Sequence, residues 1–168
     1  MLKRRSERRA VARQKRETLQ VVAFQVGAER YGIDIASVQE IDRLQPITRV
    51  PQALSFVEGV IHVRGAIIPV VDLARRFGLE LTVAERQTRI IIANLRGQSV
   101  GFIVSTVTEV VAIPVKSIGP VPPLTFDRTR KFISGMARHE ETLISILSLD
   151  QLLSTEEIGQ LQQQQSLF

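Results

Sequence analysis

Short apolar runs separated by turn residues dominate the chain from residue 21 onward. These runs are rich in Val, Ile and Phe, and Gly, Pro or polar residues interrupt them every few positions, a pattern typical of β-strands. The clearest runs are Val21–Val26, Val60–Val63, Ile67–Val71, Arg89–Leu95, Val100–Val104 and Thr142–Leu147. The pattern therefore predicts an all-β, or mainly β, fold of short strands.

The chain also contains an internal repeat. A displacement of 69 positions places residues 22–41 over residues 91–110 without a gap. The identical pairs in that alignment are Gly32 and Gly101, Val38 and Val107, and Glu40 and Glu109. A displacement of 76 positions aligns residues 56–59 with 132–135 and residues 67–73 with 143–149. Between the 69-position and 76-position alignments, residues 50–51 match residues 121–122 at a displacement of 71. Three matches in the same order indicate a duplication.

Two related units of about 65 to 75 residues are too small for large sandwiches. We expect small closed β-barrels, because closure removes exposed strand edges. Duplication predicts that the units face each other about a pseudo-twofold axis, and the groove between them is the expected docking site. Ser37–Glu40 and Thr106–Glu109 both have the spacing of a capping box, which predicts a short helical turn in each unit.

The two ends of the chain differ from this β body. Residues 1–16 carry eight bases and one acid, which leaves 14 bases and 16 acids in the remainder. The sequence pI of about 10.4 therefore reflects a basic segment. We expect residues 1–17 to be disordered, because they cannot bury enough apolar surface. Residues 18–158 are expected to form a single domain of two interlocked β-barrel subdomains. Residues 159–168, with the glutamine run 162–165, are the expected polar tail.

A terminal helix is predicted just before that tail. Its apolar positions are Leu149, Leu152, Leu153, Ile158 and Leu161. Ser154–Glu157 has capping-box spacing and would restart or extend the helix.

Composition excludes several chemistries. The chain has no cysteine, which excludes disulfides, zinc thiolate sites and cysteine nucleophiles. His62 and His139 have no second histidine or cysteine at ligand spacing, so neither a metal nor another cofactor is expected. No apolar run approaches the roughly 18 residues that a membrane span needs. We expect a soluble, cytoplasmic protein without membrane insertion.

The best enzyme candidate is Gly97–Gly101, which matches the G-x-S-x-G nucleophile elbow and is followed by Asp127 and His139 in the hydrolase order. That elbow requires a strand, a strained turn and a helix, whereas Ser99 is followed by a run that favours a strand. The repeat also places residues 28–32, an ordinary hairpin sequence, at the same point of the first unit. The sequence therefore argues against catalysis by Ser99.

Two other features have simple structural interpretations. Asp34 and Asp72 each end a β run, and Asp72 stands where it can cap a short helix, which explains it better than acid-base catalysis. Arg64 and Gly65 lie between two predicted strands, where Gly65 can supply the positive φ of a tight turn. Arg64 would then project at a rim, either as a solvated turn residue or as a partner contact or salt bridge that orients the groove.

With these segments located, the chain resembles the bacterial chemotaxis coupling protein family CheW. The matching segments are 31–35, 38–41, 47–51, 59–73, 88–91, 132–135 and 149–153, and the resemblance covers about residues 18–158. The most specific element is the Arg-Gly-x-x-Ile-Pro-Val-x-Asp-Leu core at 64–73. His62 departs from the family pattern, which more usually has a polar or aliphatic residue before the Val-Arg-Gly.

The resemblance implies two pseudo-symmetric SH3-like five-stranded β-barrels with short helices and a C-terminal helix, and no catalysis. It implies an adaptor that couples methyl-accepting chemoreceptors to a CheA-type histidine kinase, in chemotaxis or in a related motility pathway such as that of type IV pili. The cytoplasmic receptor tip would dock in the groove between the barrels and the kinase regulatory domain at the barrel ends, so that the chain is recruited to membrane-associated receptor arrays.

Carried over to this sequence, the receptor-binding candidates are Val38, Glu40 and Arg64, with Glu40 and Arg64 paired across the groove. Gly59 and Gly65 would support that surface. The alternative is a small-barrel protein that binds RNA or a membrane surface through the basic N-terminal segment, with strongly salt-dependent affinity. The resemblance implies no nucleic-acid partner.

Overall fold

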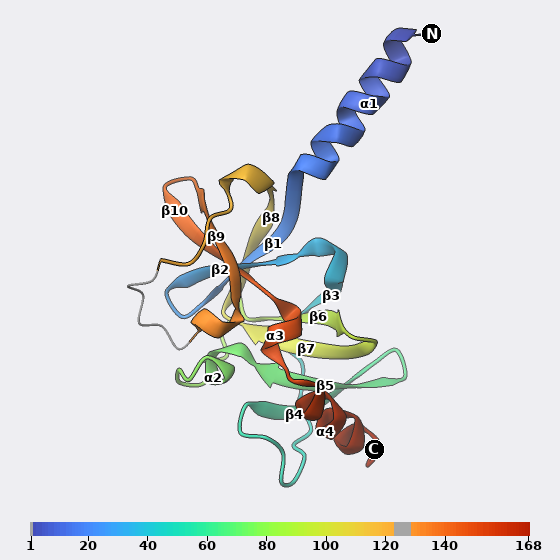
Figure 1. Ribbon diagram of the computed structural model, residues 1–168. Helices are drawn as coiled ribbons and strands as arrows, with labels where there is room; N and C mark the ends of the chain where they lie inside the picture. The colour runs from blue at the N-terminus through green and yellow to red at the C-terminus, as the bar shows by residue number, and fades with distance from the viewer. Residues whose placement is uncertain (1, 123–128) are drawn as a thin grey trace.

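The computed structural model describes residues 2–122 and 129–168, and within them ten strands form two five-stranded sheets (Figure 1). The first repeat supplies β1 (Thr18–Val26), β2 (Glu29–Asp34), β3 (Val38–Arg43), β4 (Val57–Val63), β5 (Ala66–Asp72) and the short helix α2 (Leu73–Arg76). The second supplies β6 (Arg89–Leu95), β7 (Gln98–Val104), β8 (Thr106–Pro114), β9 (Ile133–His139), β10 (Thr142–Leu147) and α3 (Leu149–Leu152). The mainly β class is confirmed, and each of the six predicted runs lies in a strand.

The internal repeat recurs in the boundaries of the elements. β4, α2 and the start of β5 lie 76 positions before β9, α3 and the start of β10, and β2 begins 69 positions before β7. Isolated β-bridges join Thr48 to Val60 and Gly119 to Met136, which are equivalent pairs in the two repeats. The structure therefore agrees with the duplication predicted from the sequence.

Each sheet mixes the two repeats. The strand order is β8-β1-β2-β10-β9 in one sheet, here sheet A, and β3-β6-β7-β5-β4 in the other, sheet B. Each sheet thus combines the first two strands of one repeat with the last three of the other. β2 takes β10 as its parallel neighbour, and β7 takes β5. The two repeats therefore exchange strands, because strands with the same apolar pattern can pair across repeats as well as within one.

Both sheets curl until their edges approach. The edge strands are β8 and β9 in sheet A and β3 and β4 in sheet B. Paired hydrogen bonds of 2.8 and 2.9 Å join Thr48 to Val60, and a pair of the same lengths joins Gly119 to Met136. Each pair ties the segment that follows one edge strand to the opposite edge strand. Five strands in each sheet are confirmed, while continuous closure into barrels stays a prediction.

Three hydrophobic clusters fill the body. Along β1, Val21 and Ala23 point into a cluster within sheet A, whereas Val22 and Phe24 point into a central cluster. Along β6, Ile90 and Ile92 point into a cluster within sheet B, and Ile91 and Ala93 into the same central cluster. Successive strand residues face opposite sides of a sheet, so these runs are apolar on both faces. The central cluster joins the two sheets into one folded unit.

An aromatic row crosses the central cluster. The ring centroids lie 6.1 Å apart between Phe24 and Tyr31, 5.1 Å between Tyr31 and Phe77, and 5.7 Å between Phe77 and Phe132. Such separations suit offset or tilted ring contacts. The row connects β1 and β2 to the segment after α2 and to the 3₁₀ turn Arg130–Phe132 that precedes β9.

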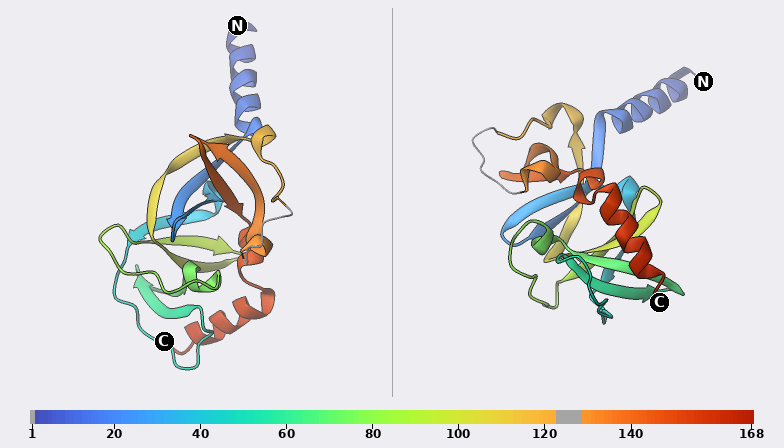
Figure 2. Two further views of the ribbon diagram at one scale, coloured as in Figure 1. Left: turned by 90° about the vertical axis from the view of Figure 1, so that its left-hand side faces the viewer. Right: turned by 60° about the horizontal axis from the view of Figure 1, so that its bottom comes forward.

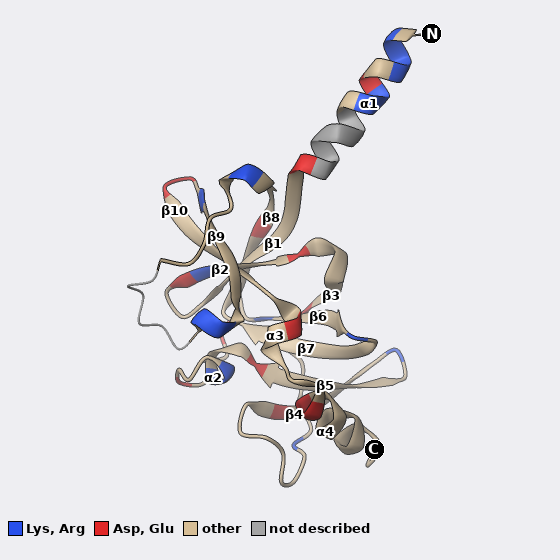
Figure 3. Cartoon of the chain, viewed as in Figure 1, with Lys and Arg blue, Asp and Glu red and all other residues tan. Residues whose placement is uncertain are grey.

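The N-terminal residues form a helix where the sequence predicts disorder. α1 (Leu2–Glu17) projects from the start of β1 away from both sheets (Figures 1 and 2). Its residues 2–10 are exposed, and Lys and Arg recur along its described turns (Figure 3). Arg, Lys, Glu, Gln and Ala all have high helix propensity. A charge-based expectation omits that propensity.

The C-terminal helix extends further than expected. α4 (Thr155–Gln165) begins with the predicted capping box between Ser154 and Glu157. It continues through the glutamine run, Leu161 is fully buried, and Gln165 donates a side-chain hydrogen bond to the Ile67 carbonyl. The helix therefore continues past residue 158, into the segment expected to be a polar tail, and packs beside β5.

The two capping boxes expected inside the repeats do not start helices. Ser37 ends a single 3₁₀ turn at Ile35–Ser37, which Asp34 caps by accepting a 2.9 Å hydrogen bond from the Ala36 amide. The residues after it form β3, and Thr106 begins β8. Val38 follows Ser37 and Val107 follows Thr106, and β-branched residues such as these favour strands. Among the described helices, none combines the length and hydropathy that crossing a membrane requires.

Candidate functional site

The turn between β4 and β5 places Arg64 at the surface. Arg64 has φ 50° and Gly65 has φ 80°, and positive values at both central residues give the hairpin turn that matches the twist of its strands. The Arg64 side chain is 82% exposed. Both expectations hold: Gly65 adopts a positive φ, and Arg64 projects from a rim.

Glu40 lies beside that turn on the edge strand β3. Its Oε1 accepts a hydrogen bond of 3.2 Å from an Arg64 guanidinium nitrogen, and its side chain is 25% exposed. β3, β4 and β5 all belong to sheet B. The predicted pairing of Glu40 with Arg64 is therefore present, but it bridges two parts of one curled sheet and does not cross from one sheet to the other.

Val38 begins the same strand. It is half-buried and packs against the central cluster, so it offers only part of its surface to a partner. Gln39, between Val38 and Glu40, accepts a 2.8 Å hydrogen bond from the Ser99 hydroxyl of β7. That bond holds the β3 edge beside the interior of sheet B.

Ile41 is a neighbour that the sequence analysis did not select. It is 40% exposed on β3, next to Glu40. Its equivalent in the second repeat, Val110, is also exposed, at 54%. Aliphatic residues at equivalent edge positions were visible in the alignment of the repeats, but only the structure shows that both face solvent. Because successive strand residues face opposite sides, Ile41 lies on the other face of β3 from Val38 and Glu40. We call Val38, Glu40 and Arg64 together the ion-pair surface.

Gly59 supports this region through its backbone. Its φ is 146°, a conformation that is essentially restricted to glycine, and an added Cβ would collide with the Thr48 backbone oxygen. The paired hydrogen bonds between Thr48 and Val60 lie directly beside it. Gly59 therefore allows the segment after β3 to lie against β4. Its role in receptor binding stays a prediction.

The enzyme-like residues have structural roles. Ser99 lies within strand β7 and donates to Gln39, so the strand-turn-helix geometry of a nucleophile elbow is not formed there. Asp127 lies outside the described residues. Asp72 is buried and its Oδ1 accepts a 2.9 Å hydrogen bond from the Ala74 amide, which confirms its role as a helix cap.

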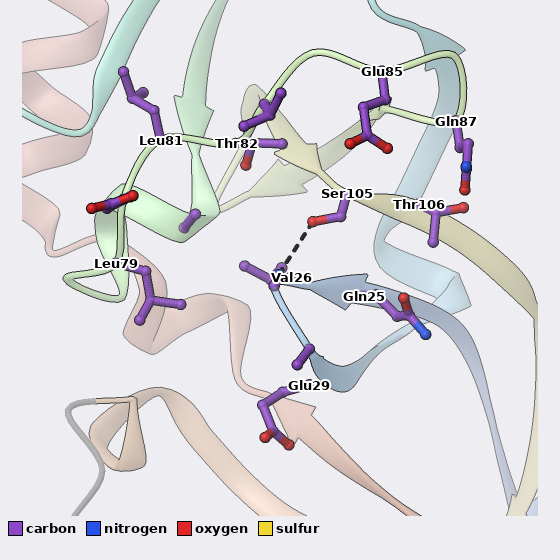
Figure 4. A pocket seen from close by; sticks show the side chains of 15 residues that line it. Gln25, Val26, Glu29, Leu79, Leu81, Thr82, Glu85, Gln87, Ser105 and Thr106 are labelled. Atoms are coloured by element: carbon purple, nitrogen blue, oxygen red, sulfur yellow. Dashed lines mark hydrogen bonds between the residues drawn. The ribbon is translucent and has the colours of Figure 1, made fainter.

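A cavity opens at another end of the body (Figure 4). It has a volume of about 640 Å³ and lies between the β1–β2 turn, the β7–β8 junction and the linker of residues 77–88 that joins the repeats. The Ser105 hydroxyl accepts a 3.2 Å hydrogen bond from the Gly27 amide within it. None of the predicted receptor-binding residues lines this cavity.

Comparisons with known proteins give a consistent match. The family model described as CheW-like domain matches residues 20–157. Chemotaxis protein CheW of Rhizobium meliloti (strain 1021) is 32% identical over 138 residues, which are 82% of this chain and 89% of that protein. Protein FrzA of Myxococcus xanthus is 32% identical over 149 residues, which are 88% and 92% of the two chains.

A solved structure agrees with these relatives. The crystal structure of scaffolding protein TtCheW from Thermoanaerobacter tengcongensis superposes with a TM-score of 0.74 at 38% sequence identity. The match covers 83% of this chain and 90% of that chain.

Proposed function

The chain belongs to the CheW-like domain family, and on that premise we propose that it couples a chemoreceptor to a CheA-type histidine kinase. As a member of that family it is a non-catalytic adaptor of chemotaxis or of a related motility system. The finer proposal concerns its partners. The cytoplasmic tip of a receptor contacts the ion-pair surface, the regulatory domain of the kinase contacts another face, and the chain is thereby recruited to receptor arrays.

The observation that carries the proposal is the pairing of Glu40 with an Arg64 that is largely exposed. A surface ion pair of this kind contributes only about 0–1 kcal/mol to folding. An arginine at positive φ costs about 1 kcal/mol relative to ordinary backbone. The pair is therefore a poor device for stability and a good device for presenting an oriented guanidinium group.

The neighbourhood of the pair also suits a protein partner. Half-buried Val38, on the same face of β3 as Glu40, places apolar surface beside the charges. Interfaces concentrate their binding energy in a few apolar or arginine contacts near the centre and surround them with polar groups. A helical receptor tip with apolar residues flanked by an acid would complement this combination.

Arg64→Ala tests the proposal in a reconstituted assembly of receptor, kinase and this chain. We expect receptor-dependent kinase activity and receptor binding to fall about tenfold, in the range of one central contact. The thermal midpoint of the purified variant should stay close to that of the parent, because the side chain is exposed. Kinase binding without receptor should be unchanged.

Arg96→Ala is the matched control. Arg96 and Gly97 form a second Arg-Gly turn, with φ values of 50° and 85°, between β6 and β7. Its side chain contacts Thr155 and Asp150, so this variant removes a turn arginine together with its contacts to the C-terminal helices and leaves the ion-pair surface intact. Two results would show that the ion-pair surface is not the receptor site. Either Arg64→Ala couples receptor to kinase as well as the parent does, or Arg64→Ala and Arg96→Ala lose that coupling equally.

A further inference from the structure

The cavity between the repeats is anionic. Its lining includes Glu29, Glu80 and Glu85, and no Lys or Arg is among its lining residues. The described body outside α1 carries both signs, as Figure 3 shows, so this lining is a local concentration of one sign. A surface of this kind attracts a cationic partner and raises its rate of association.

The same cavity has apolar walls exposed to solvent. Leu79, Leu81 and Val83 of the linker are 50%, 49% and 73% exposed. In Figure 4 the linker passes around one side with Leu79, Leu81 and Glu85, and the β1–β2 turn with Val26 and Glu29 lies opposite. Three exposed aliphatic residues on one short segment are typical of a surface that a partner covers.

Hydrogen bonds hold the linker in place before any partner arrives. The two Asp72 carboxylate oxygens accept from the Thr82 amide at 3.0 Å and from its hydroxyl at 2.9 Å. The Thr88 hydroxyl accepts from the Glu85 amide at 2.9 Å. Because Asp72 and Thr88 are both buried, the walls are fixed from inside the fold. We call this cavity with its exposed linker walls the groove, and a preformed groove loses less conformational entropy when a partner binds to it.

The complementary surface within this chain is α1. Its sixteen residues include eight bases and two acids, and it is about 24 Å long at the rise of an α-helix. Lys3, Arg4, Arg5, Arg8 and Arg9 are all exposed. Long arginine and lysine stems can cover aliphatic side chains while their charged ends reach carboxylates. α1 therefore matches both the charge and the apolar walls of the groove.

α1 and the groove of one molecule lie apart in the structure. α1 ends directly before Thr18, the first residue of β1, whereas Val26, the last residue of that strand, lines the groove. Nine strand residues separate the two points by about 26 Å. Figures 1 and 2 show α1 leading away from the body on the far side of that strand.

We infer that the groove formed by Glu29, Glu80, Glu85, Leu79, Leu81 and Val83 binds the basic helix α1 of a second copy of this chain. The contact joins two different surfaces, so it is heterologous, and it adds molecules head to tail into rings or open chains. Assembly depends on charge, so salt weakens it. This inference does not depend on the ion-pair surface or on the identity of the receptor.

Sedimentation velocity of the full chain tests it. At about 0.05 M ionic strength the weight-average mass should rise with protein concentration above that of the monomer, and at about 0.5 M it should return to the monomer. E80K/E85K in the groove and R8E/R9E on α1 should each weaken self-association about tenfold or more. Circular dichroism should show that both variants keep the parental fold.

Two comparisons make the result specific. E140K/E141K makes the same change of charge at the exposed β9–β10 turn, outside the groove, and should assemble as the parent does. An equal mixture of E80K/E85K and R8E/R9E should form heterodimers, because the first still supplies a basic helix and the second an acidic groove.

The inference is overturned by a parent chain that stays monomeric at low salt, by assembly that survives deletion of residues 1–17, or by E140K/E141K that weakens assembly as much as the groove variant. A monomeric chain whose α1 binds vesicles containing anionic lipid would assign the helix to a membrane surface instead.

Discussion

The two β-hairpins that close the repeats share a backbone and differ in charge. The β4–β5 turn has Arg64 and Gly65 at φ 50° and 80°, and the β9–β10 turn has Glu140 and Glu141 at 48° and 63°. Glu40 faces Arg64, while its equivalent Glu109 pairs at 3.4 Å with Arg30 of β2. The backbone of the turn therefore tolerates opposite charges, and only the first repeat has the arginine that the ion-pair surface uses.

The central cluster gives the largest contrast between the repeats. Phe24 of β1 is fully buried there, and the equivalent position on β6 is Ala93. Phe24→Ala should lower the free energy of unfolding by about 3–5 kcal/mol, because it removes a large side chain and leaves a cavity. Urea titration followed by circular dichroism measures the loss.

The same titration sharpens the comparison of the sheets. Both sheets should unfold in one transition, because the cluster that Phe24 occupies belongs to both. Two transitions, with sheet B persisting after sheet A has unfolded, would show that the sheets are independent units. Hydrogen exchange of the β6 and β7 amides in Phe24→Ala distinguishes these results.

Gly59 and Gly135 are equivalent residues that should respond differently to alanine. A Cβ on Gly59 meets backbone and the residue has φ 146°, whereas a Cβ on Gly135 meets the Ile118 side chain at 2.6 Å and the Gly119 oxygen at 3.2 Å. Gly59→Ala should cost about 3 kcal/mol. Gly135→Ala should cost about 1–2 kcal/mol, since Ile118 can shift. Equal losses in chemical denaturation would contradict this account of Gly59.

The smallest effect concerns the hairpin turns themselves. Glu141→Gly places a glycine where the first repeat has Gly65, and should stabilise the chain by about 1 kcal/mol by removing a side chain from left-handed backbone. Gly65→Glu makes the reverse change and should destabilise it by a similar amount. Thermal unfolding of the two variants should therefore shift in opposite directions, and a shift of the same sign in both would mean that their turns are not equivalent.

The most informative feature of the sequence was its internal repeat. Apolar runs located strands, and the displacements of 69 and 76 positions identified equivalent residues such as Glu40 and Glu109. The pairing of Glu40 with Arg64 was implied by the resemblance to the CheW family. Local patterns could not show which strands become neighbours, because β5 and β10 offer similar apolar faces to β2 and β7.

The prediction of helical turns at the two capping boxes failed for a local reason, whereas other features depend on contacts between distant segments. Ser37 and Thr106 have the spacing of capping boxes, but strand pairing of the following residues outweighs that signal. The solvent exposure of Ile41, the fixed linker and the cavity beside it depend on contacts between distant segments. Buried Asp72 illustrates this: its cap on α2 was predictable, whereas its hold on Thr82 was not.

The exchange of strands between repeats also has a consequence for synthesis on the ribosome. β1 and β2 emerge first, but sheet A is complete only after β8, β9 and β10 have followed. Pairing between residues so far apart along the chain slows folding and delays it until translation is nearly finished. Two separate single-repeat chains could form the same arrangement only as a dimer that swaps strands. Cleavage of the chain between the repeats would leave neither half with a whole sheet.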